Sequence, residues 1–293
     1  MLYPMLFKPI YKEMLWGGKR MTAYGRDLPF ERTGESWDIS CRPNEMSLIE
    51  NGPLAGMPFD KAIAKDPAAF LGTAVHSSYE RNGFPLLIKI IDANEDLSVQ
   101  VHPDDAYAAA HKLESGKSEM WYIMEAAPGQ SLIMGLSEGA TAEKLRLDPM
   151  SCLKRLPVKK GDIINIPAGL VHAITKGLIV AEIQQNSDIT FRLYDYERMG
   201  LDGKGRELHL DEGIAAVNFK GGHRRLPFTV QQYEVDGEII ESSNPEAFTI
   251  FTCVDGSCEI SGVSLSCSRS AFIPAGLGSY NITGKAILLK SFV

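Results

Sequence analysis

The sequence predicts a mainly β protein with helical insertions. Turn signals rich in glycine and proline recur along the chain, for example at Trp16-Gly17-Gly18, Asn51-Gly52-Pro53 and Pro274-Ala275-Gly276. The runs between them, such as FPLLIKII, GLIVAEIQQ and AFTIFTCV, are short and rich in β-branched and aromatic residues. Many short strands separated by frequent turns indicate a β-sandwich or a β-barrel.

A repeated segment predicts that one barrel-like unit occurs twice. The run IPAGLVH ends at His172 and the run IPAGLGS ends at Ser279, 107 positions later. We place the boundary near Gly221-Gly222, which gives units of residues 1–222 and 223–293, the second without the histidine. The alternative is that two turns made of common residues recur by chance.

Helical periodicity is confined to three segments. MPFDKAIAKDPAAFL predicts a helix that is broken before Pro67, and DDAYAAAHKLES predicts a helix with Asp104 as its N-cap. TAEKLRLDPMSCLKRL predicts a third helix, interrupted at Asp148-Pro149. These helices are insertions in a chain that is otherwise built from strands.

The composition argues against several classes of function. A hydrophobic content of 44% and a charged content of 23% are typical of a globular protein. The net charge of -7 argues against nucleic acid or an anionic membrane as the main partner. No apolar run reaches the ~18 residues of a membrane span, and no secretory signal pattern is present. We expect a cytoplasmic protein, a monomer or weak homodimer, whose five cysteines are free thiols.

Four side chains have the types and the spacing of a metal site. A strand in LSVQVHPDD would place alternate residues on opposite faces. One face would carry Ser98, Gln100 and His102, and the other Leu97, Val99 and Val101. Glu119 lies in GKSEMWYIM, and His172 follows the turn Pro167-Ala168-Gly169, which would end one strand and start the next.

The donor atoms of this set suit zinc, manganese or iron. Two imidazoles and one carboxylate leave coordination positions open, and the amide of Gln100 would add a neutral oxygen. Each residue also has an ordinary structural explanation. His102 could cap a strand, Glu119 could pair with Lys117, His172 could be a core histidine and Gln100 a strand-edge amide. The prediction therefore depends on the four residues occurring together.

Charged residues near these positions point to an anionic substrate. The run NSDITFRLYDYER alternates, with Asp188, Thr190, Arg192 and Tyr194 on one face and Ile189, Phe191 and Leu193 on the other. An inward arginine is costly without an anion, so Arg192 would bind either Asp188 or a substrate oxyanion. Lys89 is a single charge inside an apolar strand. Lys117 shares the face of Glu119, where a nearby cation would disfavour its ammonium form and make it a proton acceptor.

At these residues the chain resembles the type I mannose-6-phosphate isomerases in their short bacterial form, a family of the cupin superfamily. The resemblance covers most of residues 7–200, through KPIYKEMLWGG, GESWDIS, FPLLIKIIDANEDLSVQVHPDD, GKSEMW, PAGLVHAI and NSDITFRLYDY. QVHPDD with a downstream KxE is its most specific part. The PxGxxH turn is the second half of the cupin signature, whose usual first histidine pair is replaced by Gln100 and His102.

The resemblance implies a fold of two cupin-like (jelly-roll) β-barrels. Residues 1–222 would form the catalytic, metal-binding cupin domain with helical insertions. Residues 223–293 would form the barrel portion without metal ligands. Beyond Gly221 the match is faint, so only the fold is carried over there.

The resemblance also implies the roles of individual residues. One Zn²⁺ per chain would be held by Gln100, His102, Glu119 and His172, with Mn²⁺ or Fe²⁺ as alternatives. The catalytic group would comprise Arg192 and Asp188, which match the family's Asp-x-x-x-Arg, and Lys117, which matches the lysine of its KPE element. The resemblance places Trp16 and Lys89 near the sugar, and we expect Glu35 and Ser98 to contact the substrate as well. Because a phosphate needs donors, Lys89, Arg192 and Ser98 are the candidates for binding it. Two positions depart from the family, because Ser118 replaces a proline and Gly116 a common histidine.

The implied reaction is the interconversion of mannose 6-phosphate and fructose 6-phosphate through a cis-enediol. A base moves a proton between C1 and C2 while a metal ion or an arginine stabilises the charge that develops on the oxygens. Two other functions stay open. A cupin dioxygenase would depend on iron and oxygen, whereas a binding protein would take up sugar phosphate without exchanging the C2 proton with solvent. Lys117 and Arg192 favour a phosphosugar, and the departures at Gly116 and Ser118 keep the binding protein open.

Overall fold

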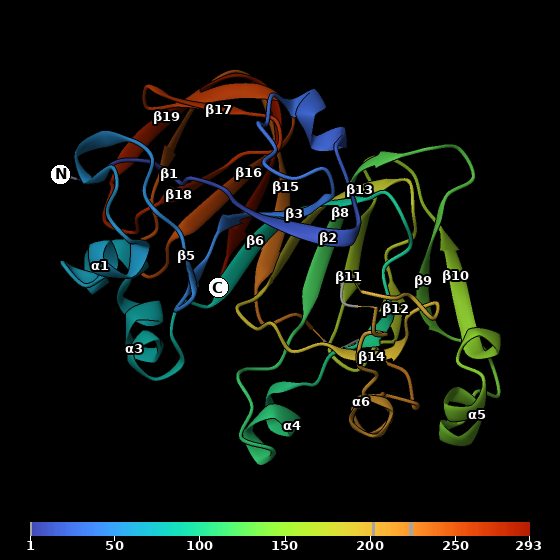
Figure 1. The fold of residues 1–293 in the computed structure, drawn as a ribbon. Coiled ribbons are helices and arrows are strands. Elements are labelled where there is room, and N and C mark those ends of the chain that lie inside the picture. Colours follow the sequence, from blue (N-terminus) through green and yellow to red (C-terminus); the bar gives the residue numbers. More distant parts are fainter. Residues whose placement is uncertain (1, 201–202, 223–224) are drawn as a thin grey trace.

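The computed structural model describes residues 2–200, 203–222 and 225–293, and its strands form four sheets (Figure 1). The first, here called the central sheet, has six strands in the order β11 (Ile163–Ile166), β8 (Glu119–Ala126), β13 (Leu178–Gln185), β6 (Leu86–Ala93), β3 (Thr33–Ile39) and β2 (Ile10–Gly18). The second, the facing sheet, has five strands in the order β10 (Leu153–Pro157), β9 (Ser131–Leu136), β12 (His172–Ala173), β7 (Val99–Val101) and β14 (Phe191–Tyr194).

The third sheet, the C-terminal sheet, lies on the other side of the central sheet (Figure 1). Its strands are β1 (Met5–Leu6), β18 (Ser270–Ile273), β16 (Thr249–Ile260), β19 (Ser279–Phe292) and β15 (Thr229–Ser242), with β17 (Val263–Ser266) paired to β16. Strand β1 pairs with β18, so the start of the chain belongs to this sheet. The fourth sheet is the small hairpin of β4 (Cys41–Arg42) and β5 (Glu45–Met46).

The central sheet is buried on both faces, as the continuous apolar run of β6 leads one to expect. Ile88 and Ile90 pack with residues of the C-terminal sheet such as Ile250. Ile91 points the other way, into the core shared with the facing sheet. Because side chains alternate along a strand, Lys89 lies on the same face as Ile91. The polar residues of this face are therefore enclosed between the central and facing sheets.

The helices are short and pack on the sheets, α5 and α6 on the outer face of the facing sheet and α1 and α2 on the core shared by the central and C-terminal sheets. They are α1 (Phe59–Ile63), α2 (Pro67–Leu71), α3 (Thr73–Asn82), α4 (Asp105–Ala110), α5 (Ala142–Leu147) and α6 (Leu210–Ala216), with 3-10 turns η1 (Arg20–Tyr24), η2 (Gly52–Leu54) and η3 (Met150–Cys152). The break before Pro67 and the cap of α4 are confirmed, since Asp104 accepts a hydrogen bond from the Tyr107 backbone N at 2.8 Å. No helix in the described ranges is long and apolar enough to cross a membrane.

Two local predictions are wrong. SCLKRL does not continue a helix after Pro149, because it forms η3 and then β10, the edge strand that pairs with β9. Leu97 does not share a face with Val99 and Val101. It precedes β7 and packs into the core between the two sheets, whereas the two valines pack on the far side of the facing sheet.

The repeated IPAG segment forms the turn between two successive strands in both copies, although the first copy joins two sheets and the second stays within one. It links β11 to β12 in one copy and β18 to β19 in the other, and His172 and Ser279 are the first residues of the strands that follow. In both copies the leucine N donates to the proline carbonyl oxygen at 3.1 Å, Leu170 to Pro167 and Leu277 to Pro274. The sheets containing these turns are open layers in the part of the chain that is described, so the structure shows a mainly β protein rather than closed barrels. The expected boundary at Gly221-Gly222 adjoins residues 223 and 224, which lie outside the described residues.

Candidate active site

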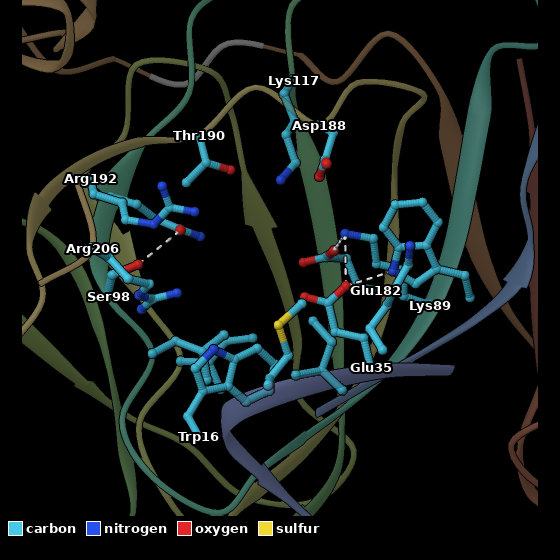
Figure 2. Close-up of a pocket in the computed structure, with 17 residues that line it drawn as sticks. Trp16, Glu35, Lys89, Ser98, Lys117, Glu182, Asp188, Thr190, Arg192 and Arg206 are labelled. Carbon is cyan, nitrogen blue, oxygen red and sulfur yellow. Dashed lines mark hydrogen bonds and ion pairs between the residues drawn. The ribbon is translucent and has the colours of Figure 1, made fainter. Parts of the chain in front are cut away.

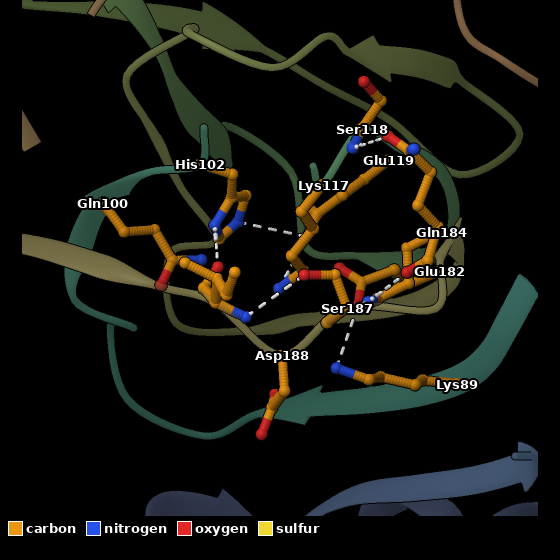
Figure 3. Close-up of polar contacts among 12 residues, drawn as sticks. Lys89, Gln100, His102, Lys117, Ser118, Glu119, Glu182, Gln184, Ser187 and Asp188 are labelled. Atoms are coloured by element: carbon orange, nitrogen blue, oxygen red, sulfur yellow. Dashed lines mark hydrogen bonds and ion pairs between the residues drawn. The ribbon is translucent and has the colours of Figure 1, made fainter. Parts of the chain in front are cut away.

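Three of the four predicted metal ligands converge between the central and facing sheets. Two of them, His102 and Glu119, are labelled in Figure 3. His102 follows β7, Glu119 begins β8 and His172 begins β12. One ligand atom from each lies within 4.8 Å of the others, and all three residues are buried. Nε2 of His102 is 3.1 Å from Glu119 Oε1, and Nε2 of His172 is 3.8 Å from Glu119 Oε2.

Backbone carbonyl oxygens fix the tautomer and the orientation of the two imidazole rings. Nδ1 of His102 donates to the Ile189 carbonyl oxygen and Nδ1 of His172 donates to the Leu170 carbonyl oxygen, both at 2.8 Å. A carbonyl only accepts, so the proton of each neutral ring lies on Nδ1 and the Nε2 lone pair faces Glu119. Burial favours this neutral form, since it lowers the pKa of His172 and lowers that of His102 to about 3.

The arrangement leaves polar atoms that a cation would satisfy. His102 Nε2 and Glu119 Oε1 are buried and lack a well-directed hydrogen bond among the described residues, although Lys117 Nζ lies 3.0 Å from the carboxylate oxygen. Both are acceptors, so neither can satisfy the other, and a buried acceptor without a partner is costly. Two imidazole nitrogens and a carboxylate are ligands that a divalent transition metal prefers. The residues present therefore fit a metal ion.

Gln100 lies beside this cluster. It is the cross-strand partner of His172, and its Nε2 lies 3.3 Å from His172 Nε2. The two ends of an amide are assigned from their hydrogen bonds, and rotation about the last bond exchanges them. With the amide rotated, the oxygen of Gln100 would face the histidine nitrogens. Gln100 is thus placed to be the fourth ligand.

Lys117 lies in the loop before β8 and contacts the same carboxylate. Its Nζ is 3.0 Å from Glu119 Oε1, and the side chain is buried. Burial alone would raise the pKa of Glu119, but the charges of Lys117 and then His102 hold it well below the usual value. Glu119 is therefore a carboxylate, the form that binds a metal ion.

The two departures from the family pattern have structural reasons. A Cβ at Gly116 would lie 2.5 Å from the backbone N of Asp105, so the start of α4 leaves no room for a side chain there. Ser118 connects β8 to the turn before His172, because its Oγ accepts a hydrogen bond from Ala168 N at 3.2 Å. Both residues shape the cluster without entering it.

A cavity of about 220 Å³ lies between the two sheets and opens beside the cluster (Figure 2). Gln100 and Lys117 line the cavity, which links it to the candidate metal ligands. The other predicted site residues that line it are Trp16, Glu35, Lys89, Ser98, Asp188 and Arg192. It is also lined by residues that sequence reasoning did not single out, among them Lys12, Trp37, Glu182 and Arg206.

Lys89 is held between two carboxylates on the wall formed by the central sheet (Figure 2). Its Nζ is 3.5 Å from Glu35 Oε2 and 3.4 Å from Glu182 Oε1. Burial opposes the ammonium form, but the charges of Glu35 and Glu182 outweigh it and raise the pKa of Lys89. The indole N–H groups of Trp37 and Trp121 donate to these carboxylates at 2.6 and 2.7 Å.

Glu182 is the functional candidate that sequence reasoning missed. It is buried on β13, directly opposite Lys89 on β6. Burial and then the charge of Glu119 raise its pKa to about 7, against the opposing effect of Lys89. The sequence does contain a signal for Glu182. A single carboxylate in the apolar run GLIVAEIQQ is as unusual as the single lysine in LLIKII.

Arg192 lies on the opposite wall of the cavity. It is on β14, where it is the cross-strand partner of Gln100 on β7. Its Nε is buried and without a partner, and the structure shows no ion pair between Arg192 and Asp188 within the described ranges. Burial and the neighbouring charge of Arg206 lower the pKa of Arg192. Arg206 is itself bound by Asp195, which accepts from its Nε at 2.6 Å. Asp188 keeps its predicted place on the cavity wall, but the bulge between Arg192 and Tyr194 takes Tyr194 away from it.

A buried cluster of two histidines and a carboxylate, opening on a small charged cavity, is typical of enzymes that hold a divalent metal beside a polar substrate. Comparison with known proteins gives the family. The catalytic-domain model of phosphomannose isomerase type I matches residues 5–126. A probable mannose-6-phosphate isomerase of Bacillus subtilis is 34% identical over 314 residues, covering 97% of both chains. The chain therefore belongs to the type I mannose-6-phosphate isomerase family.

Further relatives agree with this assignment. The mannose-6-phosphate isomerase of Streptococcus mutans is 41% identical over 257 residues, which cover 86% of this chain and 78% of that protein. The crystal structure of the mannose 6-phosphate isomerase from Bacillus subtilis superposes with a TM-score of 0.88 at 31% identity, over 99% of both chains. A putative mannosephosphate isomerase from Archaeoglobus fulgidus, at 19% identity and a TM-score of 0.78, shows the fold alone.

Proposed function

We propose that this chain interconverts mannose 6-phosphate and fructose 6-phosphate, an aldose–ketose isomerisation through a cis-enediol. The observation that carries the proposal is the convergence of His102, Glu119 and His172 beside a cavity lined by Lys117 and Arg192. The family supports the same substrate. The cavity of about 220 Å³ is of a size for a small molecule.

The metal would be held by Gln100, His102, Glu119 and His172, one ion per chain. The unpartnered Nε2 of His102 supports this assignment, as does the convergence of Glu119 and His172 on it. We expect Zn²⁺, with Mn²⁺ and Fe²⁺ as alternatives that the same ligand types can bind. When bound, a divalent ion supplies Lewis acidity that stabilises negative charge on a substrate oxygen.

The base would be Glu182. Sequence reasoning gave this role to Lys117, but its Nζ is engaged by Glu119 Oε1 at 3.0 Å. Glu182 has a pKa of about 7, close to the value at which a group both accepts and returns a proton well. In this assignment Glu182 carries the proton between C1 and C2.

The lysines would act on the oxygens of the reacting carbons. Lys117 and Lys89 are buried lysines whose Nζ N–H donors reach the cavity. Preformed donors of this kind stabilise charge that develops on oxygen, and they need no reorganisation when it appears. Glu35 holds Lys89 in place, Trp16 closes the apolar side of the cavity, and Asp188 faces the region near Lys117 (Figure 2).

The phosphate would be bound by Arg192, with Ser98 and Arg206 beside it. The other cations that line the cavity each have a carboxylate partner: Lys12 has Glu45, Lys89 has Glu35 and Glu182, Lys117 has Glu119, and Arg206 has Asp195. Arg192 has no ion-pair partner among the residues described, so its guanidinium is available for a doubly charged anion.

We also propose that the chain is built from two cupin-like units, residues 1–222 and 223–293. The support is the pair of matching IPAG turns, each leading into a strand whose first residue is His172 or Ser279. The second unit has serine where the first has a metal-binding histidine. It would therefore bind no metal ion at that position.

The central experiment measures mannose 6-phosphate turnover, coupled to detection of fructose 6-phosphate, together with bound metal. Chelation is expected to abolish turnover and a divalent metal to restore it. His172→Ala is expected to lose metal and turnover together, whereas His76→Ala, at a histidine on α3, keeps both. Full turnover by metal-free His172→Ala would disprove the metal assignment. Dependence on oxygen would point to the dioxygenase, and binding without exchange of the C2 proton to the binding protein.

A further inference from the structure

A buried arginine joins the C-terminal sheet to strand β3, behind the wall of the cavity. Arg26 follows η1, and its side chain is only 3% exposed. The guanidinium donates to Ser36 Oγ at 2.7 Å and to Asp38 Oδ2 at 2.8 Å, both on β3. It also donates to Ser268, at Oγ (2.9 Å) and at the carbonyl oxygen, in the turn between β17 and β18. One side chain therefore spans three segments.

These contacts reach the face of β3 that points away from the cavity. Glu35 and Trp37 line the cavity. Side chains alternate along a strand, so Ser36 and Asp38 point to the other face. Ser36 is the cross-strand partner of Ile90, which packs in the core shared with the C-terminal sheet. Arg26 thus holds β3 from behind.

The pairing of β3 with β6 changes register at the residue that Arg26 binds. Trp37 pairs with Lys89 and Ile39 pairs with Ile88, so Asp38 is an extra residue on β3. Such a β-bulge re-aims side chains and is common next to active sites. A slip of one residue would turn Glu35 and Trp37 to the opposite face of the sheet.

The chemistry of the contact suits the fixing of a register. Burying two charges costs about as much as their attraction returns, so a buried ion pair is a weak source of stability. Its best-attested use is to specify one arrangement among several. Here Asp38 accepts from Arg26 at one oxygen and from Ser36 Oγ (2.9 Å) at the other. A slipped strand would lose these bonds and leave a buried carboxylate without partners.

We propose that Arg26, Asp38 and Ser268 are positioning residues for the isomerase reaction. They fix the bulge of β3 so that Glu35 Oε2 lies beside Lys89 Nζ (3.5 Å) and accepts from Trp37 Nε1 (2.6 Å). Through Ser268 the C-terminal sheet thereby orders the cavity of the other unit. This inference rests on the proposed function, because its main readout is isomerase turnover.

The test removes the charges and keeps the packing. Arg26→Met combined with Asp38→Leu replaces the buried pair with apolar side chains, a change that is often neutral for stability. We expect an unfolding temperature near that of the unchanged protein and a kcat/KM lower by ~10- to 100-fold, the usual effect of misplaced groups. Arg269→Met is the matched control. Its guanidinium leaves the same turn but contacts Phe7 O and Glu50, so kcat/KM should not change.

A double-mutant cycle separates positioning from general loosening. Glu35→Gln removes the group that the bulge is proposed to place. Adding it to the Arg26/Asp38 double variant should lower kcat/KM no further, because both changes remove one interaction. Effects that multiply, or a folded double variant with the kcat/KM of the unchanged protein, would overturn the proposal.

Two further measurements keep the outcome decisive. If the double variant does not fold, Arg26→Lys is used, which keeps the charge but cannot bridge β3 and Ser268 with one planar group. A several-fold lower kcat/KM supports the proposal, and an unchanged value overturns it. Hydrogen exchange at the amides of Glu35 and Trp37 reports on β3 without turnover. It should be faster in the Arg26 variants than in Arg269→Met, and equal exchange overturns the proposal even if the unchanged protein shows no isomerase activity.

Discussion

Lys89 and Glu182 are direct cross-strand partners in the central sheet, and their charged ends lie 3.4 Å apart. Both are almost fully buried. The charge of Lys89 lowers the pKa of Glu182, while burial and the charge of Glu119 raise it to about 7. This balance places a carboxylate that titrates near neutrality on the wall of the cavity, with a fixed cation beside it.

Replacement of Glu182 is expected to stop the proton transfer without affecting the metal. Glu182→Gln keeps the size and the hydrogen bond from Trp121 but cannot accept a proton. We expect kcat to fall at least ~100-fold, the usual contribution of a positioned base. Exchange of the C2 proton with deuterated solvent should fall in parallel, with bound metal unchanged.

Two further variants are compared with Glu182→Gln: Lys117→Met tests the alternative base, and Glu125→Gln is the control. If Lys117 donates to a substrate oxygen, Lys117→Met lowers turnover but retains measurable C2 exchange. Glu125 contacts Tyr24 outside the cavity lining, so Glu125→Gln should behave like the unchanged protein. Rapid C2 exchange in Glu182→Gln would return the role of base to Lys117.

Replacement of Lys89 is expected to move the pH dependence of catalysis. A base with a pKa of about 7 is protonated and inactive below that pH, so kcat/KM should fall on the acid side. Lys89→Met removes the charge that favours the carboxylate form of Glu182. The acid limb should therefore move to higher pH. The measurement is kcat/KM between pH 5.5 and 9, with Lys12→Met as the control, since Lys12 also lines the cavity but pairs with Glu45 and not with Glu182. An acid limb that stays in place in Lys89→Met would show that another group sets it.

Replacement of Arg192 is expected to weaken binding of the phosphate. Arg192→Met should raise KM for mannose 6-phosphate by ~10- to 100-fold, the range for a charge-assisted hydrogen bond to phosphate. Turnover of unphosphorylated mannose at high concentration, where it can be measured, should change little, because that substrate has no phosphate for Arg192 to bind. Loss of both activities in equal measure would assign Arg192 to the reacting carbons instead.

The residues that local sequence patterns predicted are those whose environment is local. Alternation in LSVQVHPDD placed Gln100 and His102 on one face, and the turn before His172 placed it at the start of a strand. Asp104 was found because a helix cap is chosen by its immediate neighbours. These features depend on only a few adjacent residues, so they can be predicted from a short segment of the sequence.

The features that sequence reasoning missed depend on partners far away in the chain. Glu182 gains its raised pKa from burial and from Glu119, and its neighbour Lys89 comes from a strand 93 positions earlier. The order of strands in the central sheet cannot be predicted from any single segment of the sequence. Bulges have the same origin, since the one after Arg192 that redirects Tyr194 arises from pairing with β7.

The metal-free protein is expected to lose stability as the pH falls below about 6.5. Burial lowers the pKa of His102 to about 3 and lowers that of His172, whereas both would titrate near ~6.5 in the unfolded chain. Between these pKa values the unfolded chain binds protons that the folded chain does not. The free energy of unfolding therefore decreases as the pH is lowered. The lowered pKa of Glu119 acts in the same direction at more acidic pH, because its contribution is present above its unfolded value and lost below it.

The measurement is the unfolding temperature in the presence of chelator between pH 8 and pH 4. His102→Asn removes one of the two histidines that resist protonation, so its unfolding temperature should fall less steeply with pH than that of the unchanged protein. His111→Asn alters an exposed histidine at the end of α4 and should keep the original slope. Equal slopes in all three proteins would mean that the buried imidazoles take up protons in the folded state, which is incompatible with Nε2 lone pairs held ready for a metal ion.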